Sequence, residues 1–239
     1  MAKMRTKSLP DWLIYLAVAT FAGLLFIPFI GGMHLFDWDE INFAESAREM
    51  IITGDYLTVR INFQPFWEKP PLFIWMQVLS MKLFGINEFA ARFPNAVCGI
   101  ITLLLLFRKG KKLYGSVFGL LWVLTYTGSL LSFLYFKSGI IDPWFNLFIF
   151  TGINYAGRFY QEEKSRGINM ALSAFFIGLA TLTKGPVALL ILLLTVAVYV
   201  IIRKFRLKFR WTEVLLFVFV YSITGGFWFI LQILKGNYA

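Results

Sequence analysis

The sequence predicts an all-α integral membrane protein, a bundle of membrane-spanning helices with one long loop outside the membrane. Of the 239 residues, 59% are hydrophobic and only 15% are charged, whereas a soluble domain is about one quarter charged and under half apolar. Apolar stretches close to the length of a membrane span recur along the chain, and the basic residues cluster between them. These observations exclude an ordinary soluble domain.

The predicted spans follow one another along nearly the whole chain. A helix needs about 20 mostly apolar residues to cross the hydrocarbon core of a bilayer. The first stretch is long for a signal peptide and no cleavage site follows it, so we expect a retained anchor. The predicted spans are Trp12 to Ile30, Phe89 to Phe107, Gly115 to Phe136, Trp144 to Tyr160, Ile168 to Leu182, Val187 to Ile202 and Val214 to Leu234.

The net charge of +10 indicates membrane topology. On a soluble protein it would suggest a nucleic-acid partner, but none is expected here because of where the charges lie. The apolar stretch Leu72 to Phe84 is only about 13 residues long, which suits an interfacial helix better than a span. If it does not cross, fifteen of the 23 Lys and Arg share one side. By the positive-inside rule that side is cytoplasmic, and so is the N-terminus. Residues 31–88 then form a long extracytoplasmic loop.

The long loop begins with acids and continues as an amphipathic helix. Apolar residues recur at helical spacing over residues 43–51, and Gly54 ends the pattern. We expect this helix to lie at the membrane surface with its polar face outward. Asp37 and Glu40 have the spacing of a capping box. Asp39 is not needed for capping, and an acid held against an apolar interface is costly unless it is used, so Asp39 is a candidate for chemistry.

Four other charged residues are candidates on the same side of the membrane. Glu68 and Lys69 precede Pro70, which holds Lys69 extended, although ordinary loop polarity would also explain the pair. Asp142 begins a predicted span and Lys184 ends another, so helix capping is an equal alternative for both. Their shared sidedness favours a site. Lysine can neutralise the phosphate of a lipid, and a carboxylate can take a proton from a hydroxyl.

Other chemistries lack their sequence signals. One cysteine and one histidine exclude an internal disulfide and a His/Cys zinc cluster. Motifs of nucleotide hydrolysis and of serine or zinc hydrolysis are missing. Asp37, Asp39 and Glu40 could hold a hard divalent cation through oxygen ligands, and no other cofactor is expected. A transporter or flippase for a lipid or solute is the alternative from another class. It would place polar residues inside the spans, which hold few charges.

The motifs together resemble a known family. The chain is similar to the aminoarabinose transferase and protein O-mannosyltransferase group of integral-membrane, GT-C type glycosyltransferases, above all to its bacterial branch. The residues that carry the resemblance are Asp39-Glu40, Ala44-Glu45-Ser46-Ala47-Arg48-Glu49-Met50, Gly54-Asp55-Tyr56, Glu68-Lys69-Pro70-Pro71-Leu72, Ala91-Arg92-Phe93-Pro94 and Lys184-Gly185-Pro186.

The resemblance implies a function. It implies inverting transfer of a sugar from a polyprenyl-phosphate donor to a lipid, glycan or protein acceptor, at the periplasmic face of the bacterial inner membrane. Asp39 matches the family's first-loop aspartate, so the resemblance implies that it is the catalytic base, and Glu68 is expected to shape the acceptor side. We expect substrate-binding roles for the remaining matched residues, which are Glu40, Lys69, Asp142, Lys184 and Arg92.

The chain departs from this family in two respects. Aminoarabinose transferases usually carry Arg-Tyr where this chain has Asn42-Phe43, which weakens the case for a lipid A acceptor. Members are also typically about twice as long, with further spans and a soluble C-terminal domain. We therefore expect residues 1–239 to form a single transmembrane module that lacks the C-terminal part of the family fold. An inactive, truncated membrane subunit is a further alternative.

Overall fold

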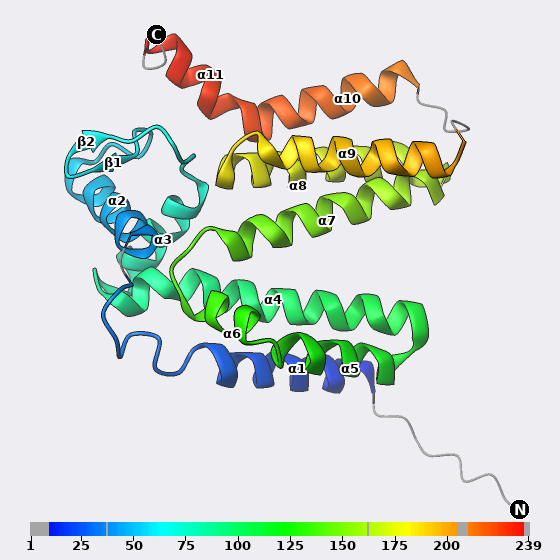
Figure 1. Ribbon diagram of the computed structural model, residues 1–239, viewed down its shortest axis with the longest axis horizontal. Helices are drawn as coiled ribbons and strands as arrows, with labels where there is room; N and C mark the ends of the chain where they lie inside the picture. Colours follow the sequence, from blue (N-terminus) through cyan, green and yellow to red (C-terminus); the bar gives the residue numbers. More distant parts are fainter. Residues whose placement is uncertain (1–9, 37, 162, 205–209, 237–239) are drawn as a thin grey trace, which may run out of the picture.

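The computed structural model describes residues 10–36, 38–161, 163–204 and 210–236, and it confirms the predicted all-α class. In this part of the chain the helices form two layers, with a small module packed at one end (Figure 1). The elements are α1 (Asp11–Phe26), α2 (Asp39–Thr53), β1 (Arg60–Ile61), β2 (Gln64–Pro65), α3 (Leu72–Phe84), α4 (Glu88–Tyr114), α5 (Ser116–Thr127), α6 (Leu130–Lys137), α7 (Asp142–Gln161), η1 (Glu163–Ser165), α8 (Arg166–Lys184), α9 (Val187–Ile202), α10 (Trp211–Tyr221), the π-helical segment η2 (Ser222–Gly226) and α11 (Phe227–Leu234).

The first layer contains α1, α4, α5 and α6, and close contacts at glycine hold it together. Phe26 of α1 meets Phe136 of α6 edge to face, with ring centroids 5.0 Å apart. A side chain at Gly99 of α4 would collide with both rings. Gly119 of α5 lies against the backbone of α4 in the same way. Because the backbones approach so closely, the apolar faces of these helices bury one another.

The second layer contains α7 to α10. Gly178 of α8 packs against Gly225 in η2, where an added Cβ would come within 2.8 Å of backbone atoms. Thr181 of α8 shares a hydrogen bond of 3.1 Å with the hydroxyl of Tyr221 at the end of α10. The π-helical turn therefore packs on α8 together with α10, and α11 continues the chain beyond that contact (Figure 1).

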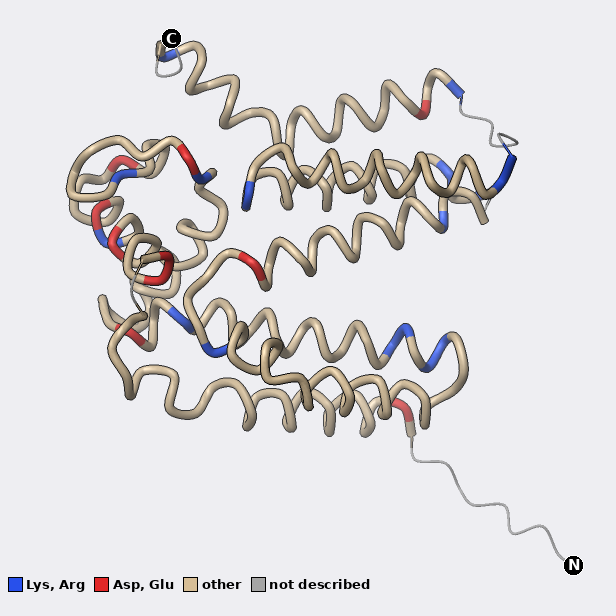
Figure 2. The backbone as a smooth tube through the Cα atoms, in the orientation of Figure 1, with Lys and Arg blue, Asp and Glu red and all other residues tan. Residues whose placement is uncertain are grey.

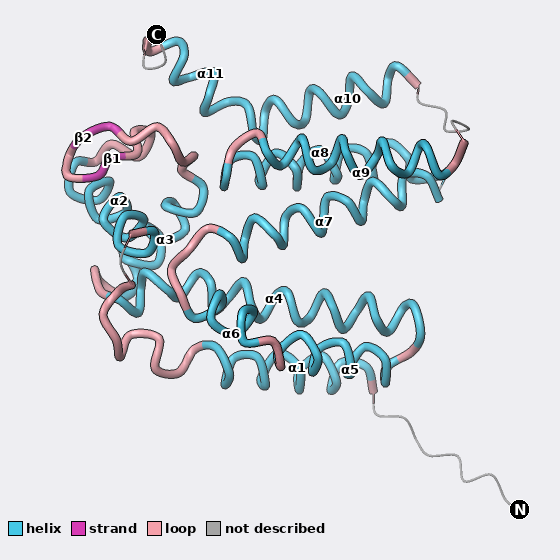
Figure 3. The backbone as a smooth tube through the Cα atoms, viewed as in Figure 1, coloured by secondary structure: helices cyan, strands magenta, loops and turns pink. Residues whose placement is uncertain are grey.

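The long loop folds into a compact module of α2, the β1–β2 hairpin and α3 (Figure 3). Helix α2 ends at Gly54, which adopts the left-handed conformation expected of a C-terminal glycine. The expected outward polar face of α2 is only partly correct, because Glu40, Ser46 and Glu49 are buried. The module rests on the bundle through α3, which packs on α4.

Each predicted span coincides with helical structure. By length and composition, three described helices could cross a membrane: α4, α8 and the continuous stretch Trp211–Leu234. The pair α5 and α6 would make a fourth, although it is bent by 74°. Helices α1, α3 and α9 are shorter apolar helices. The number of crossings stays a prediction.

The charged residues separate along the long axis of the bundle. Figure 2 shows the acids concentrated in the α2, hairpin and α3 module. Most Lys and Arg lie at the opposite end, where α4, α7 and α9 finish and α8 and α10 begin. The two ends of the bundle therefore differ in charge as well as in fold.

Candidate functional site

Asp39 is the first residue of α2, and its side chain is exposed. It lines a cavity of about 440 Å³ with mostly apolar walls that include Phe36 and Ile140. The preceding residue, Trp38, has a φ of 69°, a left-handed backbone conformation that is strained for a bulky side chain. A helix N-terminus favours negative charge. Asp39 is thus a carboxylate presented to a partly apolar cavity.

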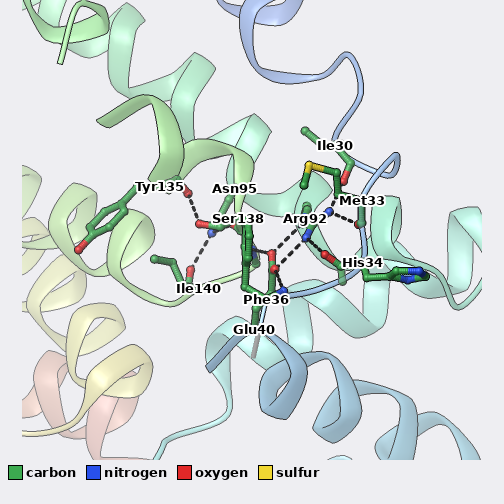
Figure 4. A network of polar contacts seen from close by, with 12 residues as sticks. Ile30, Met33, His34, Phe36, Glu40, Arg92, Asn95, Tyr135, Ser138 and Ile140 are labelled. Atoms are coloured by element: carbon green, nitrogen blue, oxygen red, sulfur yellow. Dashed lines mark hydrogen bonds and ion pairs between the residues drawn. The ribbon is translucent and has the colours of Figure 1, made fainter. Parts of the chain in front are cut away.

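Glu40, the next residue, is buried in an ion pair with Arg92 of α4. One carboxylate oxygen of Glu40 accepts hydrogen bonds from Nε of Arg92 at 2.7 Å and from the backbone N–H of Gly139 at 2.5 Å. The other accepts from Nη2 of Arg92 at 2.8 Å and from the backbone N–H of Phe36 at 2.6 Å. Both oxygens of Glu40 are therefore fully used by protein groups (Figure 4).

Arg92 is equally saturated. Besides the two bonds to Glu40, its guanidinium donates to the carbonyl oxygens of Ile30 and Met33, each at 2.7 Å, and of His34 at 2.9 Å. A guanidinium has five N–H donors, and all five are accounted for. Glu40 and Arg92 thus hold the start of α2 on the bundle. Both also line the Asp39 cavity, and their contact with substrate stays a prediction.

The same network reaches the connection that leads to Asp142. Nδ2 of Asn95, in α4, donates to the carbonyl oxygens of Ser138 at 2.6 Å and of Ile140 at 2.7 Å. Between them, Gly139 donates to Glu40 and leaves little room for a side chain, because an added Cβ would lie 3.1 Å from a backbone oxygen. The starts of α2 and α7, where Asp39 and Asp142 lie, are thereby held at the same end of the molecule (Figure 1).

Asp142 and Lys184 form an ion pair. Nζ of Lys184 donates to the Asp142 carboxylate at 2.6 Å, joining the start of α7 to the end of α8. The ammonium also lies 5.6 Å from the centre of the Phe145 ring. The side chains are 34% and 25% exposed for Lys184 and Asp142, so a ligand can reach them. The sequence pointed to both residues, and the structure brings them together.

Glu68 and Lys69 lie on the connection between β2 and α3. Glu68 is exposed and Lys69 is half-buried. In the described parts of the chain neither makes a side-chain hydrogen bond or an ion pair. The following Pro70 is buried, and Pro71 caps α3. The structure therefore presents the pair from a stiff backbone but does not join it to Asp39.

Two other acids stabilise the module. Both carboxylate oxygens of Glu49 accept from the backbone N–H of Phe63 at 3.0 Å, while burial raises the pKa of Glu49. Burial alone would raise the pKa of Asp55, but hydrogen bonds from Thr58, the backbone of Leu57 and Arg60 outweigh it and lower that pKa to about 2. Glu49 and Asp55 thus hold α2 and the hairpin together.

The described residues do not form the cation site that was predicted at Asp37, Asp39 and Glu40. The described residues contain no group of three His, Cys, Asp or Glu that could hold a metal ion. Glu40 has its oxygens engaged by N–H donors, and Asp37 lies outside the described residues. The reaction proposed below therefore has no step that uses a metal ion.

Lys137 is a site residue that the sequence did not single out. It lines the same cavity as Asp39. Its Nζ donates to the carbonyl oxygen of Pro28 at 2.9 Å and lies 5.2 Å from the centre of the Phe133 ring. The ammonium of Lys137 adds positive charge to this cavity, and it has three N–H donors. In the sequence it is simply a lysine at the end of an apolar stretch, and only the fold brings it near Asp39.

The match to a protein family covers most of the site outside α2. The sequence model described as dolichyl-phosphate-mannose-protein mannosyltransferase matches residues 68–228. The chain belongs to this family. The match confirms the predicted protein O-mannosyltransferase group and includes Glu68, Lys69, Arg92, Asp142 and Lys184.

Curated relatives and a solved structure extend the likeness to the whole chain. The undecaprenyl phosphate-alpha-4-amino-4-deoxy-L-arabinose arabinosyl transferase of Edwardsiella ictaluri is 27% identical over 214 residues, covering 88% of this chain and 37% of that protein. Transferase 1 of the same name from Sodalis glossinidius is 32% identical over 199 residues, covering 79% and 34%. The crystal structure of ArnT from Cupriavidus metallidurans bound to undecaprenyl phosphate matches with a TM-score of 0.77 and 25% identity, covering 97% of this chain and 43% of that one.

These matches confirm the predicted GT-C type helical fold. The chain spans about two fifths of the length of the relatives that it matches.

Proposed function

We propose that this protein transfers a sugar from a polyprenyl-phosphate-linked donor to a lipid, glycan or protein acceptor. The observation that carries the proposal is an exposed carboxylate, Asp39, set in a partly apolar cavity by the buried Glu40–Arg92 pair. The family supports this chemistry, and so do the arabinosyl transferases and the undecaprenyl phosphate complex among the similar proteins.

In the proposed reaction Asp39 is the general base. It takes the proton from the acceptor's hydroxyl or amine as that atom bonds to the anomeric carbon of the sugar. The bond between this carbon and the phosphate oxygen breaks on the opposite side, so the configuration inverts. Polyprenyl phosphate leaves with the electron pair of the broken bond. Glu68 orients the acceptor in this scheme.

Lysines bind the phosphate of the donor. Within the described residues Lys184 donates one hydrogen bond, to Asp142, which leaves two of its three donors for phosphate oxygens. Lys69 approaches from the connection before α3, and Lys137 lines the Asp39 cavity. Positive charge at these positions stabilises the leaving group as its negative charge develops. Asp142 holds Lys184 in place.

The proposed location is the periplasmic face of the bacterial inner membrane. The end of the bundle that carries Asp39 is the end rich in acids, and the opposite end gathers most of the Lys and Arg (Figure 2). Basic segments remain on the cytoplasmic side. We therefore assign the N-terminus and the ends of α4 and α9 to the cytoplasm. Residues 1–239 act as one multi-pass module with the loop of residues 31–88 in the periplasm.

A transfer assay in proteoliposomes tests the proposal. The chain is supplied with a panel of undecaprenyl-phosphate sugars and with membrane lipid acceptors, and released undecaprenyl phosphate is measured by mass spectrometry. We expect sugar-dependent release that falls at least a hundredfold in Asp39→Asn, because loss of general base catalysis typically costs 10²- to 10⁴-fold. Glu88→Gln is the matched control, since Glu88 is a half-buried acid at the same end and pairs with His34.

The other outcomes identify the alternatives. Movement of a lipid or solute across the membrane without sugar release would indicate a transporter or flippase. Binding of the donor lipid with no turnover would indicate a non-catalytic membrane subunit. Full activity in Asp39→Asn would overturn the assignment of the base.

A further inference from the structure

A second polar cavity lies at the end of the bundle away from Asp39. Its volume is about 470 Å³, and residues of α1, α4 and α7 line it. Five of these residues are basic, and we call the cavity the basic pocket. They are Arg108, Lys109, Lys111, Lys112 and Arg158. The pocket belongs to none of the chemistry proposed above.

Two of the positive charges in the basic pocket have no carboxylate partner in the described parts of the chain. Lys111 pairs with Asp11 at the start of α1. In the described parts of the chain no carboxylate pairs with Arg108 or Lys112, both of which are exposed. Lysines in the last turn of α4 suit the helix C-terminus, but Arg108 lies about one turn earlier. Positive charges that line a concave site attract anions and raise their local concentration.

The inner wall of the basic pocket is apolar. Leu105 of α4 and Phe150 of α7 form it, and the same two side chains line an adjoining cavity of about 390 Å³. That cavity continues between α4, α6 and α7 past Leu106 and Leu147. A cationic cavity therefore adjoins an apolar one at Leu105 and Phe150, and a molecule with an anionic head and a hydrocarbon tail has the same order of polarity.

We propose that the basic pocket binds the phosphate head group of an anionic phospholipid, with an acyl chain along Leu105 and Phe150. The occupant is a lipid of the leaflet on the basic side, which is the cytoplasmic leaflet in the topology proposed above. Basic pockets between membrane helices on this side bind such head groups. Arginine suits a phosphate especially well because its planar fork makes two parallel hydrogen bonds. The proposal needs membrane insertion but does not depend on sugar transfer.

Native mass spectrometry of the purified chain in neutral detergent tests the proposal. Phosphatidylglycerol and phosphatidylcholine with identical acyl chains are titrated against the wild type, R108Q/K112Q and R203Q/K204Q. The last variant is the charge-matched control, because Arg203 and Lys204 are exposed at the same end but outside the pocket. We expect the wild type to prefer phosphatidylglycerol, the pocket variant to bind it about 30-fold more weakly, and the control to stay within about threefold of the wild type.

Two further arms locate the ligand. Inorganic phosphate at constant ionic strength should not displace the lipid, since the acyl chain contributes to binding. A phosphatidylglycerol with a photoreactive acyl chain should crosslink to peptides from the second half of α4 or of α7. The proposal is overturned by equal losses in both variants, by displacement with inorganic phosphate alone, or by crosslinks confined to other helices.

Discussion

Asp39 and Glu40 are neighbours in the chain but lie in opposite environments. Asp39 faces a cavity, whereas the side chain of Glu40 is 1% exposed and is held by four N–H donors. The acidic residues at positions 37, 39 and 40 predicted a functional site in this region. The sequence could not divide the roles, because Arg92 and Gly139, which hold Glu40 on the bundle, lie 52 and 99 residues away in the chain.

Glu40→Gln tests this division. Breaking a buried ion pair leaves an unpaired charge, so we expect a loss of about 3 to 5 kcal/mol in the free energy of unfolding. Arg92→Lys should also destabilise the protein, since lysine cannot reproduce five donors in a fork. Denaturant unfolding in detergent measures both effects, with Glu88→Gln as control, because Glu88 is only half-buried. A cost below about 1 kcal/mol for Glu40→Gln would show that the pair does not hold α2.

At the scale of elements, hydropathy predicted where helices run but not where they break. The apolar stretch Gly115 to Phe136 is one predicted span, yet the structure divides it into α5 and α6 with a bend of 74°. The break falls at Gly128 and Ser129, a pair that commonly interrupts helices. Likewise the last predicted span contains a π-helical turn at Gly225 and Gly226, next to α8. An average of hydropathy registers neither the Gly-Ser pair nor the contact of Gly225 with α8.

Gly119→Ala tests the close packing of α4 and α5. An added Cβ would lie 2.8 Å from the backbone oxygen of Phe107, so one helix must shift, and we expect a loss of about 1 to 3 kcal/mol. Gly157→Ala on α7 is the matched control. It meets nothing within 4 Å, so the better helix propensity of alanine should leave stability unchanged or slightly higher. Thermal unfolding of both variants in the same detergent makes the comparison, and equal behaviour would contradict the close contact.

At the scale of the whole molecule, topology depends on whether α3 crosses the membrane. The sequence predicts that it does not, because crossing would divide the basic clusters between the two faces. The structure supports this on length: 13 helical residues extend about 20 Å, whereas the hydrocarbon core is about 30 Å thick. Helix α3 also packs against α2 within the loop module, and its Phe73, Ile74 and Gln77 are buried. The distribution of Lys and Arg and the packing of α3 therefore both indicate that α3 does not cross the membrane.

Cysteine labelling in spheroplasts tests whether α3 crosses the membrane. Gln64→Cys and Ile86→Cys flank α3 at exposed positions, and Leu113→Cys lies at the end of α4. If α3 stays on one side, a membrane-impermeant maleimide should label the first two variants directly and Leu113→Cys only after permeabilisation. The native Cys98 is fully buried, and burial raises the cost of forming its reactive thiolate, so the wild type should give little background. Labelling at only one of the positions flanking α3 would place that helix across the bilayer. It would also put Asp39 and the Asp142–Lys184 pair on opposite faces, which no single site at one membrane surface could accommodate.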